Sequence, residues 1–337
     1  MINLVKKLCN LSAASGNEDT VREFILNEIS PYCEAYTDQN GNIIAFKKGK
    51  KTPNKKIMLD AHMDEVGVIV TSVTESGLLR FETVGGILTE SLLGATVRFK
   101  DILGVIGIKP IHLCDKDEKK ALPKPENLFI DIGAKDKEDA LKYVSLGDIG
   151  SFKENFTEAS GGRFISKAID DRIGCALLIT LIKEKSEYDF YATFTVSEEL
   201  GLRGAKTAAY TVSPDIAIVL EATTAADING APIGDRVCEV SGGAVISFMD
   251  NSTLYNRQLF DKAFSLANKN NIKLQAKEKV AGGNNSGAIS LSKGGVKTIT
   301  VSLPCRYIHS PSSLADISDA ENMLGITRHL VKAFANL

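Results

Sequence analysis

Long apolar runs and blocks of positive charge are both missing from this chain of 337 residues. No apolar run approaches the roughly 20 residues that a membrane-spanning helix needs, so we expect no membrane partner. The 40 basic and 42 acidic residues are interspersed, which argues against nucleic acid as a main partner. The first residues also lack a signal-peptide core, and a cytoplasmic location is therefore the expectation.

Cysteine and histidine are scarce. The six cysteines are dispersed without a CxxC pair, which favours reduced, buried thiols and gives no support to a structural zinc site. Any bound metal should therefore be held by histidine and carboxylate groups. With only four histidines in the chain, each can be judged by its own sequence neighbours.

Apolar residues make up 44% of the chain and charged residues 24%, values typical of a globular protein large enough for two domains. Residues 68–163 alternate short apolar runs with glycine and charged residues, which predicts an inserted, smaller β-rich domain with one small helix at 137–144. Residues 1–67 and 164–337 mix helical and strand patterns. We therefore predict that they form one discontinuous α/β domain.

Hydrophobic periodicity gives the expected elements of the α/β domain. Helices are expected at 2–10, 18–31, 252–268 and from about 173 onward, and strands at 43–46, 56–59, 190–196, 215–220 and 296–303. Ser318 and Glu321 form a capping box that predicts the start of the last helix. The glycine- and asparagine-rich segment 281–290 is expected to be a loop.

The strand predicted from Phe190 to Val196 stops at two adjacent carboxylates, Glu198 and Glu199. Two carboxylates at the end of a buried strand repel each other and lose hydration, so something must offset that cost. Exposure on a surface loop is one explanation. The other is that one carboxylate binds a metal ion while its neighbour transfers a proton, which requires further ligands elsewhere.

Several other elements end in groups that fit a metal site. His62 ends an apolar strand and is followed by Asp64, a spacing that suits a ligating imidazole and the carboxylate that orients it. Asp170 stands beside a second aspartate at a helix start, and Glu221 follows an apolar strand. His309 follows the last predicted strand. Because ligands of open α/β sheets gather at the carboxyl ends of the strands, these groups can converge.

The other two histidines fit simpler roles. His112 lies beside a polar loop of the predicted insert and is interpreted as a solvent or interface residue. His329 lies near the end of the last helix, where it can interact with the helix dipole. The remaining candidates form a set that suits two divalent ions: His62, Asp170, Glu198, Glu199, Glu221 and His309.

The runs LDAHMDEVGVIV, KAIDDRIG, TVSEELGLRGA, VLEATTAAD, SFMDNSTLYN and PCRYIHSP resemble, in this order, the tetrahedral (TET) dinuclear-metal aminopeptidases, the glutamyl-aminopeptidase and endoglucanase M-like family. The resemblance implies an α/β metallopeptidase fold, a mixed sheet flanked by helices like that of zinc aminopeptidases, with an inserted β-barrel-like domain for dimerisation or as a lid. It implies peptide substrates, two divalent ions (zinc or cobalt), and assembly from dimers to a dodecamer.

The resemblance also implies residue roles. His62 and Glu221 would hold one metal, Glu199 and His309 the other, and Asp170 would bridge both, often with a cis peptide after it. Glu198 would be the general base, and Asp64 would orient His62. Two positions depart from the family pattern, since Glu221 and Asn285 stand where relatives carry aspartate and an acidic residue, respectively.

Three other functions stay open from the sequence. A related two-metal amidohydrolase or deacylase would share the site and differ in its pocket. A glycosidase with two catalytic carboxylates needs no metal and would leave His62 and His309 unexplained. A catalytically silent, self-assembling scaffold would not need the six-residue set. The side chain that selects the substrate is not assigned, although Arg306 lies close to His309 in the sequence.

Overall fold

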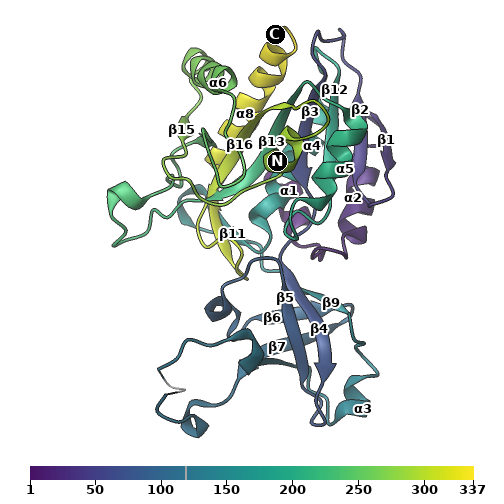
Figure 1. The fold of residues 1–337 in the computed structure, drawn as a ribbon, viewed down its shortest axis with the longest axis vertical. Coiled ribbons are helices and arrows are strands. Elements are labelled where there is room, and N and C mark those ends of the chain that lie inside the picture. The colour runs from purple at the N-terminus through teal and green to yellow at the C-terminus, as the bar shows by residue number, and fades with distance from the viewer. Residues whose placement is uncertain (118–119) are drawn as a thin grey trace.

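An eight-stranded mixed sheet and a closed barrel make up the two parts of this computed structural model, which describes residues 1–117 and 120–337 (Figure 1). Residues 118–119, which belong to the predicted insert, lie outside the described residues. Helices flank the sheet, and the barrel lies at one end of the molecule. The predicted fold class, α/β with a smaller barrel-like domain, is confirmed.

The large sheet has a parallel centre. Its strands, in spatial order, are β1 (Glu34–Thr37), β2 (Ile43–Lys47), β12 (Phe190–Thr195), β3 (Ile57–His62), β13 (Ile216–Thr224), β16 (Lys297–Cys305), β14 (Ala244–Ile246) and β15 (Leu274–Ala276). The neighbours β12, β3, β13 and β16 all run in the same direction. Their carboxyl ends therefore meet along one edge of the sheet.

Side-chain alternation explains how the sheet is covered on both faces. On β13, Ile216, Ile218 and Leu220 pack into the main core, whereas Ala217 and Val219 pack on the opposite face. The main core is covered by α1 (Ile2–Cys9), α2 (Asp19–Ile29), α4 (Ile169–Lys183), α6 (Arg257–Asn270) and α8 (Ile317–Phe334). The other face is covered by α5 (Arg203–Val212) and α7 (Ser286–Ser290).

The barrel has its own core, separate from that of the sheet. Its strands are β4 (Gly67–Val73), β5 (Leu79–Val84), β8 (Leu128–Asp131), β7 (Ile102–Ile108), β6 (Thr96–Phe99) and β9 (Ile149–Phe152), and the short helix α3 spans Lys137–Ala140. A separate three-stranded sheet joins β10 (Thr157–Glu158), β11 (Arg163–Ser166) and β17 (Ser313–Asp316). The limits 68–163 of the inserted domain stay a prediction.

Short 3-10 helices complete the chain: η1 (Thr89–Leu92), η2 (Ile111–Leu113), η3 (Pro125–Asn127), η4 (Ser160–Gly162) and η5 (Ile233–Asp235). In the described ranges 1–117 and 120–337, no helix combines the length and the apolar character needed to cross a bilayer.

Two helix starts differ from the sequence expectation because of side-chain caps. Helix α6 begins at Arg257 and not at residue 252, since the Asn256 side chain accepts a hydrogen bond from the Leu259 N–H. Helix α8 is capped by Asp316, which accepts a hydrogen bond from the Ser318 N–H, so the predicted capping box of Ser318 is wrong. Segment 281–290 is also not entirely a loop, because α7 forms at its end.

A buried ion cluster joins the segment between β3 and β4 to the start of α4. Lys167 and Glu65 are fully buried, and Lys167 Nζ lies 2.7 and 2.8 Å from the two carboxylate oxygens of Glu65. Arg172, also buried, donates to Glu65 at 3.1 Å. Burial lowers the pKa of Lys167, and the charge of Glu65 opposes that shift. One carboxylate thus offsets two buried cations.

Replacing Glu65 by glutamine is therefore expected to destabilise the protein by about 3–5 kcal/mol, because both cations lose their buried counter-charge. The measurement is urea unfolding followed by circular dichroism. Glu75→Gln is the matched control, since Glu75 pairs with Lys137 on the surface and should change stability by less than about 1 kcal/mol. Equal stabilities of the two variants would show that the buried cluster contributes nothing.

Candidate metal centre

The six groups singled out from the sequence lie together at the carboxyl edge of the central strands. His62 is the last residue of β3, and Glu198 and Glu199 follow β12 within four residues of its end. Glu221 lies inside β13, which continues to Thr224, so the expected strand end at residue 220 is wrong. His309 follows β16. The site thus forms where four neighbouring parallel strands end.

Asp170 occupies the centre of this group and faces a different histidine with each carboxylate oxygen. Its Oδ1 lies 3.2 Å from His62 Nε2, and its Oδ2 lies 3.1 Å from His309 Nε2. Glu221 Oε1 lies 3.3 Å from His62 Nε2, and Glu199 Oε1 lies 3.2 Å from His309 Nε2. Each histidine therefore belongs to a triad of potential metal ligands. The His62 triad includes Glu221, the His309 triad includes Glu199, and Asp170 is common to both.

The Nδ1 atoms of both imidazoles form hydrogen bonds with main-chain carbonyl oxygens. His62 Nδ1 lies 3.1 Å from the carbonyl oxygen of Asp64, and His309 Nδ1 lies 3.0 Å from that of Gly86. A carbonyl oxygen can only accept, so each Nδ1 must carry a hydrogen. Each Nε2 lone pair is then free to bind a metal ion on the side of the carboxylates.

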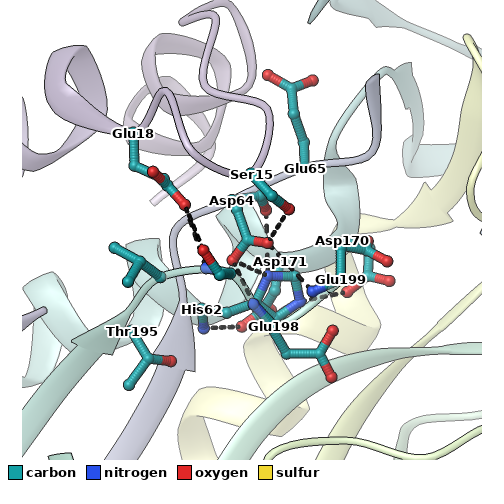
Figure 2. A network of polar contacts seen from close by, with 12 residues as sticks. Ser15, Glu18, His62, Asp64, Glu65, Asp170, Asp171, Thr195, Glu198 and Glu199 are labelled. Carbon is teal, nitrogen blue, oxygen red and sulfur yellow. Dashed lines mark hydrogen bonds and ion pairs between the residues drawn. The ribbon is translucent and has the colours of Figure 1, made fainter. Parts of the chain in front are cut away.

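Asp64 holds the loop that carries the two glutamates (Figure 2). Its carboxylate accepts hydrogen bonds from the main-chain N–H groups of Glu198 at 3.0 Å and Glu199 at 3.1 Å. Its Oδ1 also lies 3.5 Å from His62 Nδ1. Asp64 therefore positions groups of both triads.

The N-terminal segment supports this loop in a way that the sequence pattern did not reveal. The hydroxyl of Ser15 donates to Asp64 at 2.5 Å. Glu18 accepts hydrogen bonds from the N–H groups of Gly16 and Ser197 at 2.9 and 3.1 Å. In the sequence, residues 15–17 mark only a helix break, and nothing in that pattern identifies the partners of Ser15 or Glu18.

Left-handed backbone marks the segments that present the ligands. Ala168, Ser197 and His309 have φ values of 52°, 52° and 56°, a conformation that few residues with a Cβ adopt. The peptide bond between Asp170 and Asp171 is cis. Gly85 has a φ of 88° and lies in the loop after β5, which approaches Glu199 closely. A Cβ atom added at position 85 would lie 3.2 Å from the Cβ of Glu199.

The electrostatics of the cluster favour bound cations. Burial, with a further contribution from the charges of Glu199, Asp170 and Asp64, raises the pKa of Glu198 to about 8. Burial opposes the charged form of His309, yet Asp170 and Glu199 raise its pKa to about 11. The buried Glu199 Oε1 makes no hydrogen bond. Mixed imidazole and carboxylate donors with an unsatisfied oxygen fit divalent ions.

Asp171, the second aspartate of the pair, is a neighbour of the cluster to which the sequence assigned no ligand role. It is fully buried and can form a group of potential ligands with His62 and Glu221. However, its oxygens already accept hydrogen bonds from the N–H groups of His62 at 3.2 Å and Gly174 at 2.9 Å. Asp171 therefore fixes the start of α4 against β3.

The remaining candidates lie apart from the cluster. His112 is exposed in η2 of the barrel, and His329 lies on α8. Arg306, which lies close to His309 in the sequence, forms an ion pair with Asp227 at 2.6 and 2.8 Å. Neither histidine is part of the ligand groups found in the described ranges.

Asn285 does not line the substrate side of the site. It is fully buried, and its amide donates to Asp60 and to Thr195, each at 2.8 Å. Burial raises the pKa of Asp60 to about 6. An amide at position 285 therefore satisfies a buried carboxylate that a second acidic side chain would repel, and its role is to join β3 and β12.

A cavity of about 250 Å³ opens beside the cluster. Asp170, Glu198, Glu221 and His309 line one part of it, and residues 281–284 line another. Thr223, Thr224 and Ile308 complete a partly apolar wall. The cavity is therefore large enough to admit a side chain next to the histidines and carboxylates.

The chain is similar to known peptidases both in its sequence and in its fold. A model of the M42 glutamyl aminopeptidase family matches residues 41–326. A relative from Acetivibrio thermocellus is 40% identical over 96% of both chains, and the lysyl aminopeptidase of Pyrococcus furiosus is 32% identical over 98% of this chain and 96% of its own. The solved Pyrococcus horikoshii TET1 peptidase, which can assemble into a tetrahedron or a large octahedral shell, has a TM-score of 0.86 and 33% identity, with 98% of each chain covered.

Proposed function

The chain belongs to the M42 glutamyl aminopeptidase family, and from this premise we propose that it removes N-terminal residues from peptides with the help of two divalent metal ions. The observation that carries the proposal is the placement of Asp170, whose two oxygens face His62 and His309 at 3.2 and 3.1 Å. A carboxylate placed in this way can bridge two ions.

The donor groups divide into two sets. His62 and Glu221 would hold one ion, Glu199 and His309 would hold the other, and Asp170 would contribute to both. Zinc and cobalt both suit this mixture of imidazole and carboxylate groups. When bound, the ions would promote ionisation of a water molecule and polarise the scissile carbonyl group.

Glu198 supplies the proton transfer in this proposal. It lines the cavity beside Asp170, and its backbone is held by Asp64. Its carboxylate takes a proton from the attacking water and returns it to the leaving amine. Asp64 positions other groups and transfers no proton. Its carboxylate oxygens already accept hydrogen bonds from the Glu198 and Glu199 N–H groups and from the Ser15 hydroxyl.

The test is to incubate the metal-loaded protein with matched unblocked and N-acetylated peptides and to follow the products by mass spectrometry. Stepwise loss of N-terminal residues from the unblocked peptides, abolished by acetylation and by a chelator, is the expected result. Release of the acetyl group would favour the deacylase. Absence of any cleavage while both ions are bound would favour the scaffold and overturn the proposed activity.

We also propose that the chain associates with itself, from dimers to a dodecamer, in the cytoplasm. The support is the likeness to the Pyrococcus horikoshii peptidase over 98% of the chain. Native mass spectrometry measures the assembly directly. A monomer at micromolar concentration would contradict this part of the proposal.

A further inference from the structure

Lys277 is a buried cation in the wall of the cavity beside the metal centre. It directly follows β15 and its N–H donates to the Ile246 carbonyl at 2.9 Å, which fixes its main chain at the sheet edge. Only 5% of Lys277 is exposed. Of the residues that line the cavity, Lys277 and the candidate ligand His309 are the basic ones.

The ammonium group of Lys277 has few partners for a buried charge. Its Nζ donates to the carbonyl oxygen of Ala281 at 2.5 Å, and Ala281 lines the same cavity. In the ranges 1–117 and 120–337, no carboxylate lies within 4.0 Å of this nitrogen. An ammonium carries three donors, so hydrogen-bonding capacity remains.

The acidic groups whose charges act on Lys277 have other partners. Asp250 accepts hydrogen bonds from Ser252, Thr253 and Tyr255, at 2.5 to 2.9 Å. Glu221 belongs to the His62 triad. Burial lowers the pKa of Lys277, and these two carboxylates oppose the shift only from a distance. An anion that enters the cavity would therefore meet a cation that lacks a counter-ion.

We propose that Lys277 makes this aminopeptidase selective for peptides whose N-terminal residue is acidic. The inference rests on the proposed function, because it takes the free amine and the scissile carbonyl to lie at the metal centre. The first side chain of the peptide then extends along the cavity, and its carboxylate pairs with Lys277. Two bound divalent ions would balance the charges of the ligand carboxylates, which would then not repel the acidic side chain.

Family membership alone does not determine which first side chain this protein selects. The family is described as glutamyl aminopeptidases, whereas a relative of similar length is a lysyl aminopeptidase. A basic first side chain would place its cation beside Lys277, a like charge in a confined space. The cavity of this chain therefore favours an acidic side chain over a basic one.

The test compares kcat/KM for p-nitroanilides of glutamate, glutamine, leucine and lysine, with the wild-type protein, Lys277→Met and Lys279→Met. Glutamate and glutamine have nearly the same size, so their ratio isolates the charge. We expect the wild-type ratio to favour glutamate by about 10- to 100-fold, and Lys277→Met to bring it close to one. Lys279 is the control, since it lies two residues away, is exposed, and pairs with Asp235 on the surface.

The remaining outcomes separate this inference from the proposed function. Good hydrolysis of leucine or lysine anilides without a preference for glutamate overturns the role of Lys277 and leaves the aminopeptidase intact. An unchanged ratio in Lys277→Met does the same, provided that metal content and thermal unfolding show a folded, loaded variant. Anilides have no C-terminal carboxylate, so an effect confined to dipeptides would assign Lys277 to that end of the substrate and also overturn the inference. Cleavage of no compound removes the proposed function itself.

Discussion

A Glu198→Gln enzyme is expected to keep both metal ions and lose about 10²- to 10⁴-fold in kcat. The amide has the size of the carboxylate but cannot accept the proton of the attacking water. In the part of the chain that the structure describes, no hydrogen bond holds the Glu198 side chain, so the substitution breaks no structural contact. The backbone of residue 198 stays anchored by Asp64.

Glu199→Gln provides the contrast for this experiment. The two glutamates are adjacent and similarly buried, yet Glu199 faces His309 Nε2 at 3.2 Å. The Glu199 variant should lose metal as well as activity, whereas the Glu198 variant should lose activity alone. Steady-state kinetics and plasma mass spectrometry of the same samples make the distinction. Turnover close to that of the wild type in Glu198→Gln would remove Glu198 from the mechanism.

An Asp170→Asn enzyme is expected to bind neither ion tightly and to lose more than about 100-fold in activity, since even indirect supports of metal sites contribute 10- to 100-fold. An amide offers one neutral oxygen and replaces the other with an N–H donor. That donor would face one of the two histidines, which Asp170 now contacts with its separate oxygens. Both donor triads lose their shared member together.

Metal content per subunit, measured after dialysis at a fixed free-metal concentration, tests this assignment. His309→Ala should retain one ion per subunit, since the His62 triad is left intact. His112→Ala is the control, because His112 is exposed on the barrel and should leave the content unchanged. Equal metal contents in Asp170→Asn and the wild type would show that Asp170 is not shared between two ions.

The groups that gather at the site could be predicted because they depend on topology. Strands that run in parallel bring their ends to one edge, so His62 and Glu198 could be expected together before any distance was known. The histidines outside the cluster were also identified by their local context. In each case the residues that flank the side chain in the sequence indicate whether it lies at a strand end or apart from the site.

The contacts that the sequence did not reveal join distant segments. Arg306 meets Asp227 across 79 residues, and Ser15 meets Asp64 across 49. Lys277 appears in the sequence as one lysine among many, and only the pairing of β15 at the edge of the sheet places it beside the cavity. The cap of α8 was missed for another reason, since Asp316 and Ser318 both suit that position and local pattern does not choose between them.

The hydrogen bond between His309 and the carbonyl group of Gly86 has a thermodynamic consequence. Gly86 lies in the loop after β5 of the barrel, while His309 follows β16 of the large sheet. One proposed metal site is therefore built across the junction of the two parts. Coupling of this kind is reciprocal, so occupancy by the ion stiffens the junction, and any rotation of the barrel changes the affinity for that ion.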